Sequence, residues 1–156
     1  MEITPFTIKD GPQVAALFRE IFKENSWSER PSDYMDEPQR LFHLSSGGMF
    51  LIVKEQGKII GTAGIILLSK TEGLVKRFYL KKQYRGSGVA QRLLAELEKH
   101  ARQIGLRKVI LDVSKNNNRA VRFYEKSGFI KTTVTPREDW IESQLPEYHY
   151  YFYKSV

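Results

Sequence analysis

The sequence contains no cysteine, and this absence limits both its chemistry and its architecture. Disulfide bonds, thiolate metal sites and a cysteine nucleophile are all excluded by it. The chain also has no apolar run of membrane-spanning length, and its N-terminus carries no apolar stretch typical of a secretory signal. The three histidines, His43, His100 and His149, are far apart in sequence and lack the spacing of metal ligands. We therefore expect a cytoplasmic protein that binds no metal and no membrane.

What the chain does contain is typical of one ordered domain. At 156 residues, with 41% hydrophobic and 12% aromatic residues, it is long enough and apolar enough to bury a core. We expect a single domain over residues 1–156, because no linker, repeat or low-complexity tract divides the sequence. The formal net charge of +7 favours an anionic partner, such as nucleic acid or a phosphorylated cofactor, but it is equally compatible with no specific partner.

The pattern of apolar residues predicts an α/β protein with a mixed sheet. Helical spacing predicts helices at 11–24, near 41–44, at 89–104 and at 119–126. Short apolar or β-rich runs predict strands at 3–8, 49–54, 59–68, 74–80, 108–113, 129–134 and 148–153. The strand at 108–113 follows a helix directly, so it should lie parallel to the strand at 74–80. The aromatic run at 148–153 is either a buried final strand or a surface that pairs across a homodimer.

The segment 83–90, with the sequence QYRGSGVA, joins the strand at 74–80 to the helix that follows. Unpaired N–H groups and the helix dipole make such a junction an anion site, and phosphate is the usual ligand. Glycines at 86 and 88 let a phosphate approach the backbone. The segment is not a dinucleotide fingerprint, because Gln91 stands at the third glycine position, and it is not a Walker loop. By itself it is equally well explained as a tight turn before a helix.

Two segments, in this order, resemble the GNAT acyltransferase superfamily. Residues 83–90 are similar to the family's pyrophosphate loop, (Gln/Arg)-x-x-Gly-x-(Gly/Ala). Residues 117–129, NNRAVRFYEKSGF, are similar to its Asn-x-x-Ala…Tyr-Glu-Lys-x-Gly-Phe element. A helix and a strand lie between the two motifs, as the family requires, and the resemblance covers nearly the whole chain. It implies a GNAT-like α/β fold, with a mixed central β-sheet flanked by helices.

The resemblance implies an N-acetyltransferase that moves an acetyl group from acetyl-CoA to a primary amine. Tyr124 matches the tyrosine that often protonates the departing thiolate. Backbone groups of one strand would pair with the pantetheine arm, the glycine turn would surround the pyrophosphate, and one asparagine would contact the cofactor. The residues implied for these three roles are Phe78, Tyr79 and Leu80; Tyr84, Arg85, Gly86, Ser87, Gly88, Val89 and Ala90; and Asn117.

Without the resemblance, Tyr124 and Asn117 have simpler explanations. A tyrosine beside Phe123 and Phe129 in an amphipathic helix usually packs in a core, and asparagine commonly caps a helix. The chemistry nevertheless fits, because a phenol can donate a proton to a thiolate of comparable basicity. A backbone N–H at the end of the strand at 78–80 can stabilise the oxyanion. The lack of cysteine favours direct attack by the amine in a ternary complex.

The general base is not determined by the two motifs. Asp112, near the end of its strand, stands where some family members carry a basic carboxylate, and it is our candidate. Glu72 lies in the region where others place theirs, but a solvated strand end explains it better. Leu74 stands where the family most often has a glutamate. A water chain is the remaining alternative, because it can deprotonate the amine without a carboxylate.

Charge placement suggests a cationic acceptor, such as a polyamine, a basic amino acid or a lysine side chain. Basic residues gather near the expected cofactor site, whereas acidic residues gather at 24–37 and 138–147. These two regions commonly flank the acceptor in the family. Trp27 and Trp140 would line its pocket. Ordinary acidic loops with packed tryptophans explain these segments equally well.

Two other functions remain as alternatives. One is a basic nucleic-acid-binding module, which is disfavoured because aromatic and basic residues do not interleave in a recognisable RNA-binding motif. The other is a protein that binds coenzyme A, has lost catalysis and acts through partners.

Overall fold

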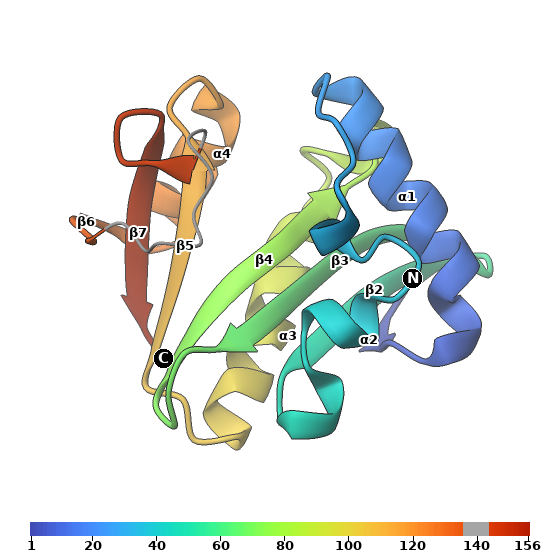
Figure 1. The fold of residues 1–156 in the computed structure, drawn as a ribbon, viewed down its shortest axis with the longest axis horizontal. Helices are drawn as coiled ribbons and strands as arrows, with labels where there is room; N and C mark the ends of the chain where they lie inside the picture. The colour runs from blue at the N-terminus through green and yellow to red at the C-terminus, as the bar shows by residue number, and fades with distance from the viewer. Residues whose placement is uncertain (136–143) are drawn as a thin grey trace.

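The computed structural model describes residues 1–135 and 144–156 and contains one seven-stranded sheet. The strands are β1 (Glu2–Pro5), β2 (Met49–Glu55), β3 (Lys58–Leu67), β4 (Glu72–Leu80), β5 (Lys108–Ser114), β6 (Ile130–Thr132) and β7 (His149–Ser155). Their order across the sheet is β1-β2-β3-β4-β5-β7-β6 (Figure 1). All neighbours are antiparallel except β4 and β5, which run parallel, as the sequence predicted. The predicted α/β fold with a mixed sheet is confirmed.

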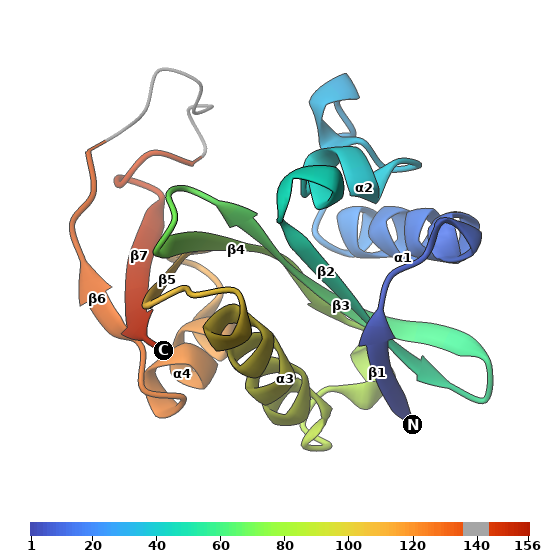
Figure 2. The same cartoon turned by 90° about the horizontal axis from the view of Figure 1, so that it is seen from below.

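Helices cover both faces of this sheet. They are α1 (Gly11–Glu24), α2 (Pro38–Leu41), α3 (Val89–Gln103) and α4 (Asn118–Lys126). Figure 2 shows α1 and α2 on one face and α3 and α4 on the other. None of the helices in the described part of the chain is long and apolar enough to cross a membrane.

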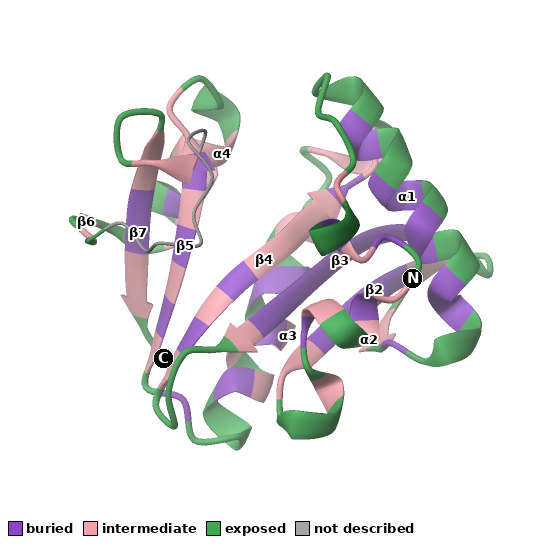
Figure 3. Ribbon diagram, viewed as in Figure 1, coloured by how far each residue is buried: buried purple, intermediate pink, exposed green. Residues whose placement is uncertain are grey.

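Each face of the sheet has its own apolar core. On one face, Val14 and Phe18 of α1 pack with Ile52, and all three are 0% exposed. On the other face, Leu93 of α3 packs in a cluster that also contains Phe152 of β7, and both are 0% exposed. Figure 3 shows the buried residues along β2 and β3 and on the sides of α1 and α3 that face the sheet. The amphipathic periodicity of these two helices therefore predicted their buried sides correctly.

The structure corrects the predicted ends of three elements. The first strand stops at Pro5 rather than residue 8, because the Asp10 carboxylate accepts hydrogen bonds from the Thr7 N–H (2.9 Å) and hydroxyl (2.8 Å). These bonds stabilise a 3-10 turn before α1 instead of a longer strand. The strand predicted at 129–134 is shortened to β6, which pairs with β7 over only three residues. The helix predicted near 41–44 is instead α2, which ends at Leu41.

The aromatic run at 148–153 forms most of β7, a strand inside the sheet. β7 pairs with β5 along its whole length and with β6 over its middle residues. Tyr151 and Phe152 are 5% and 0% exposed. The run therefore forms an interior strand with a buried middle, as one of the two alternatives predicted, while pairing across a homodimer stays a prediction.

Candidate active site

β4 and β5 pair at one end and separate at the other. Backbone pairs join residues 72–74 to 108–110, and no further pair joins the two strands in the described part of the chain. Figure 1 shows the strands diverging from there, so that one edge of residues 75–80 faces a gap. An unpaired strand edge offers N–H and C=O groups to an extended ligand. The strand residues expected to pair with the pantetheine arm, Phe78, Tyr79 and Leu80, lie on this edge.

The turn after β4 has the geometry expected of a phosphate loop. Gly86 and Gly88 both have left-handed backbone conformations, with φ of 77° and 88°. No side chain of the described residues caps the start of α3, so none of them satisfies the first N–H groups of that helix. A Cβ atom on Gly88 would meet no atom within 4 Å, which shows that the space beside it is open. These residues therefore fit a phosphate group.

Positive charge from α4 also reaches this turn. Arg119 lies in the first turn of α4, and its Nη2 is 3.9 Å from the position of a Cβ atom built on Gly86. The Arg119 side chain is exposed, so it can adapt to a ligand. The turn thus combines helix N–H groups with a cation from a second helix, and both favour an anion.

Arg85 holds the turn in place. Its Nε donates to the Leu80 carbonyl at 2.9 Å, and its two Nη atoms donate to the Glu24 carboxylate at the end of α1. The Arg85 guanidinium also holds the pKa of Glu24 below its ordinary value. The Arg85 side chain therefore fastens the turn to α1, which leaves its backbone as the part that can meet a phosphate.

Other residues expected at the cofactor have local structural roles. The Asn117 Oδ1 accepts a hydrogen bond from the Ala120 N–H at 3.1 Å and caps α4. The Ser87 hydroxyl donates to the Tyr84 carbonyl within the turn. Val89, the first residue of α3, is buried at 7% exposure. The capping role of Asn117 is thus observed, while the cofactor contacts of these residues stay predictions.

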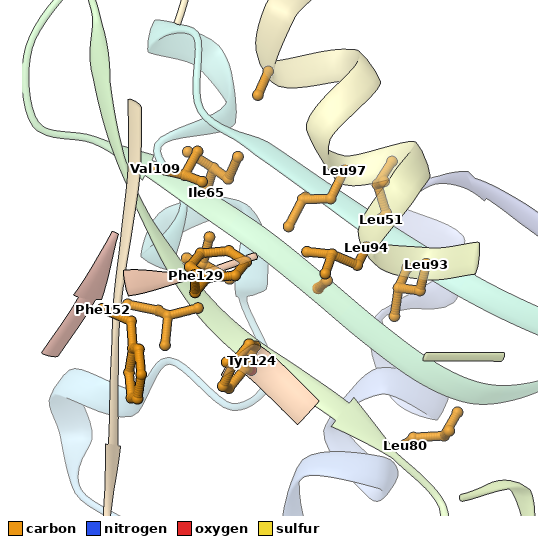
Figure 4. Packing of buried hydrophobic residues seen from close by; sticks show 14 of the residues in the cluster. Leu51, Ile65, Leu80, Leu93, Leu94, Leu97, Val109, Tyr124, Phe129 and Phe152 are labelled. Carbon is orange, nitrogen blue, oxygen red and sulfur yellow. The ribbon is translucent and has the colours of Figure 1, made fainter. Parts of the chain in front are cut away.

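Tyr124 reaches the gap between β4 and β5 from α4. Its side chain is 7% exposed, and its ring centroid lies 6.1 Å from that of Phe78 and 5.5 Å from that of Phe129. Figure 4 shows Tyr124 in the same apolar cluster as Phe129 and Phe152. The core packing that its periodicity predicted is therefore present, and it holds the ring in place.

The hydroxyl of Tyr124, in contrast to the ring, has no hydrogen-bond partner among the described residues. In that part of the chain every fully buried side-chain oxygen or nitrogen does have a partner, so the Tyr124 hydroxyl lies where solvent or a ligand can reach it. Burial raises the pKa of Tyr124, and the negative charge of Asp112 raises it further. The phenol is therefore protonated at neutral pH and available as a proton donor.

Asp112 lies beside the same gap, in a charged cluster. Its Oδ1 is 2.6 Å from the Lys76 Nζ, and its Oδ2 is 2.9 Å from the His149 Nδ1. Burial of Asp112 acts to raise its pKa, but the hydrogen bond with His149 and the charge of Lys76 outweigh it and hold the pKa at about 2. A carboxylate this acidic takes up protons poorly at neutral pH. The geometry therefore favours an anchoring role over direct proton transfer, and the base role of Asp112 stays a prediction.

Arg77 is one part of the site that sequence reasoning missed. It has a φ of 54°, and the pairing of β3 with β4 shifts register beside it, where the Thr62 hydroxyl donates to the Arg77 carbonyl at 2.8 Å. The Arg77 Nη2 forms an ion pair with Asp33 at 3.1 Å, and both side chains are buried. This bulge immediately precedes the segment 78–80, at whose end an N–H for the oxyanion is expected. No periodicity or propensity marks an arginine for a left-handed conformation.

The acidic residues at 24–37 do not form an unpaired negative surface. Each carboxylate of that segment contacts an arginine within 3.5 Å: Glu24 with Arg85, Glu29 and Asp36 with Arg19, Asp33 with Arg30 and Arg77, and Glu37 with Arg40. Trp27 is 47% exposed, and its ring lies 6.4 Å from that of Tyr79 at the end of β4. Trp140 and most of the second acidic segment lie outside the described residues.

The described residues contain no group of three His, Cys, Asp or Glu side chains that could hold a metal ion.

The model of the acetyltransferase (GNAT) family matches residues 13–129. Because this match spans well over half of the sequence, the chain belongs to the GNAT family of N-acetyltransferases. The resemblance drawn from the two motifs is confirmed.

Similar proteins agree with this assignment. An uncharacterized N-acetyltransferase of Escherichia coli is 25% identical over 130 residues, which are 79% of this chain and 78% of that protein. One of Mycobacterium tuberculosis is 31% identical over 105 residues, which are 67% of this chain and 62% of that protein. An acetyltransferase structure from Streptococcus agalactiae superposes with a TM-score of 0.81 at 20% identity, over 99% of this chain and 98% of that one. The PaiA N-acetyltransferase of Thermoplasma acidophilum, solved with coenzyme A, gives 0.76 at 20% identity over the same shares.

Proposed function

We propose that this protein transfers an acetyl group from acetyl-CoA to a primary amine, which attacks the thioester directly in a ternary complex. The observation that carries the proposal is the separation of β4 from β5, beside which the Tyr124 hydroxyl has no hydrogen bond within the described ranges 1–135 and 144–156. A binding edge and a proton donor thus meet in one gap. The absence of cysteine supports direct attack, since no cysteinyl intermediate can form.

The donor substrate is supported by two features of different chemistry. The open edge of residues 75–80 suits the amide groups of a pantetheine arm, and the turn with Gly86 and Gly88 suits a pyrophosphate. These features adjoin in sequence, so one extended molecule can occupy both. The coenzyme A complex of the structural neighbour from Thermoplasma acidophilum supports the same choice of donor.

The transfer itself needs an oxyanion donor and an acid. We assign the first role to a backbone N–H of β4 next to the Arg77 bulge, because a rigid amide in a gap stabilises developing negative charge. We assign the second role to Tyr124, whose phenol gives its proton to the sulfur as the carbon–sulfur bond breaks. The ring contacts with Phe78 and Phe129 keep that phenol in place.

The acceptor is a primary amine, and its charge is the finer part of the proposal. A cationic acceptor was suggested by two acidic segments, but the carboxylates at 24–37 are already paired with arginines. Support for a cationic acceptor now comes from Glu147 and its neighbours at 138–147. A panel of polyamines, basic amino acids, lysine peptides and neutral or anionic amines decides this point. Faster turnover of neutral or anionic amines would contradict a cationic acceptor.

A thiol assay tests the proposed function with little background. Each acetyl transfer releases one free coenzyme A thiol, and the protein itself contributes none because it lacks cysteine. We expect thiol release that depends on both acetyl-CoA and an amine, with acetylated amine found by mass spectrometry. Tight binding of acetyl-CoA without turnover of any amine in the panel would instead support a non-catalytic binding protein.

A further inference from the structure

The cluster of Lys76, Asp112 and His149 has no assigned role in the acetyl transfer described above. It joins three neighbouring strands, β4, β5 and β7, on one face of the sheet. Directly opposed residues of paired strands share a face, and the register pairs Asp112 with Tyr151 and Ser114 with His149. Because Leu111 and Val113 are buried on the α3 side, Asp112 and His149 lie on the α1 side.

The cluster stands at the start of the gap. The last residues that pair β4 with β5 are Leu74 and Ile110, and Lys76 and Asp112 lie two positions beyond them. Their ion pair of 2.6 Å therefore spans the two strands where they begin to separate. The negative charge of Asp112 also raises the pKa of Tyr124, after the larger effect of burial.

The contacts of His149 orient its imidazole. Its Nδ1 is 2.9 Å from the Asp112 Oδ2, which makes Nδ1 the protonated nitrogen, since a carboxylate can only accept. The Nε2 atom is then a lone-pair acceptor, and it has no partner among the described residues. The His149 side chain is 19% exposed, so Asp112 orients the ring while part of it stays accessible to solvent. Imidazole is the side chain that exchanges protons most readily near neutral pH.

We propose that His149 is the general base that takes a proton from the acceptor amine, and that Asp112 is the positioning residue that holds its imidazole. This inference rests on the proposed acetyl transfer. Lys76 completes the arrangement by neutralising the second Asp112 oxygen and bridging the two strands. The candidate general base thereby moves from the Asp112 carboxylate to the imidazole that it orients.

The proton balance of the reaction is then complete. An acceptor ammonium loses one proton to the His149 Nε2 and attacks the thioester carbon as a neutral amine. The new carbon–nitrogen bond forms, and the carbon–sulfur bond breaks as Tyr124 protonates the sulfur. The second proton lost by the nitrogen restores the Tyr124 phenol. His149 releases its proton to water, so the products are the acetylated amine, free coenzyme A thiol and one proton.

Two acceptors of different protonation state test this role. One is the primary amine with the highest turnover in the panel, which is an ammonium ion at neutral pH and must be deprotonated. The other is hydroxylamine, which is uncharged at neutral pH and bypasses that step. For His149→Gln we expect the amine reaction to slow by about 10²–10⁴-fold, while the hydroxylamine reaction loses far less. Asp112→Asn should show the same selectivity with a smaller loss.

A merely structural role would produce a different result. A packing or folding defect slows both acceptors equally, so equal losses, or no loss, would overturn the proposal. His100→Gln is the matched control, because His100 lies on α3 and its Nδ1 contacts the Glu96 carbonyl within the same helix. His149→Ala, measured with and without added imidazole, keeps the test valid if one variant folds poorly. We expect imidazole to restore its amine reaction, and no restoration would count against the proposal.

Failure of this inference is distinguishable from failure of the proposed function. If the wild-type protein releases no thiol with any amine, the acetyl transfer itself is contradicted. If the wild type is active and His149→Gln treats amine and hydroxylamine alike, only the role of His149 is contradicted.

Discussion

β4 and β5 are paired at one end, over residues 72–74 and 108–110, and separated at the other. We propose that the two ends also differ in function. At the paired end, Gly73 packs so closely that a Cβ atom there would stand 2.5 Å from the Ile65 Cγ2. At the separated end, an ion pair between Lys76 and Asp112 spans the strands, and the hydroxyl of Tyr124 has no hydrogen bond to any residue that the structure describes. The comparison suggests that the paired end supplies stability and the separated end supplies chemistry. Mutations at the two ends should therefore affect different measurements.

The largest expected effect is on catalysis, from Tyr124→Phe at the separated end. Loss of the proton donor should lower the rate of acetyl transfer by about 10²–10⁴-fold. The free energy of unfolding should change by no more than about 0.5 kcal/mol, because the lost hydroxyl has no hydrogen bond to a described residue. Thiol release and urea unfolding measure the two quantities. A variant that keeps the full rate would remove Tyr124 from the mechanism.

The next effect concerns the bulge that shapes the separated end. Arg77→Ala removes the buried one of the two arginine partners of Asp33, from a pair whose side chains are 8% and 7% exposed. Breaking a buried ion pair should lower the free energy of unfolding by about 3–5 kcal/mol. The matched control is Arg40→Ala, whose pair with Glu37 is 61% and 47% exposed, so its loss should lower the free energy of unfolding far less. Equal losses in urea unfolding would mean that the bulge does not depend on the buried pair.

At the paired end, Gly73→Ala should lower stability without disturbing the ligand site. The added methyl would crowd Ile65 and the Leu106 Cδ1, 2.9 Å away, so the core must shift at a cost of about 1–3 kcal/mol in unfolding free energy. Binding of acetyl-CoA, measured by titration calorimetry, should be unchanged. A variant of unchanged stability that has lost binding would reverse the roles assigned to the two ends.

The smallest effect is a dependence of stability on pH. The folded pKa of Asp112, about 2, lies below its ordinary value of 3.8. A group whose pKa is lowered by folding stabilises the native state above its unfolded pKa, and this stabilisation is lost as the pH falls from about 4 to about 2. The pKa difference corresponds to about 2 kcal/mol. Urea unfolding should show that wild type is more stable than Asp112→Asn near neutral pH and that this difference in unfolding free energy shrinks in acid. A difference that does not change with pH would contradict the account.

Local signals explain why much of the fold could be predicted from the sequence. The apolar stripe of α1 and that of α3 each follow from the spacing of residues within a single helix. The glycine turn and the motif around Tyr124 are continuous segments of the sequence. A helix cap at Asn117 follows from residue type and position alone. These features depend on neighbours a few residues away, so one sequence is sufficient to find them.

The missed features depend on contacts between distant segments. His149 contacts Asp112 only because β7 pairs with β5 in one register, and a shift by one residue would turn His149 to the other face. The acidic segment at 24–37 looked unpaired in the sequence. Some of the arginines that neutralise it, such as Arg77 and Arg85, come from distant parts of the chain. The bulge at Arg77 likewise depends on Thr62 and Asp33. Composition and periodicity do not reveal such long-range partners.

Titration calorimetry with acetyl-CoA tests the central claim, that the separated end and its glycine turn form the acetyl-CoA site. The comparison is between wild type, Gly88→Glu and Gly105→Glu. Gly88 and Gly105 both have a φ of 88° and open space where a Cβ would stand, so the two substitutions are matched in backbone strain and charge. We predict that wild type and Gly105→Glu bind acetyl-CoA and that Gly88→Glu does not. Equal binding by all three proteins, or no binding by folded wild type, would contradict the account.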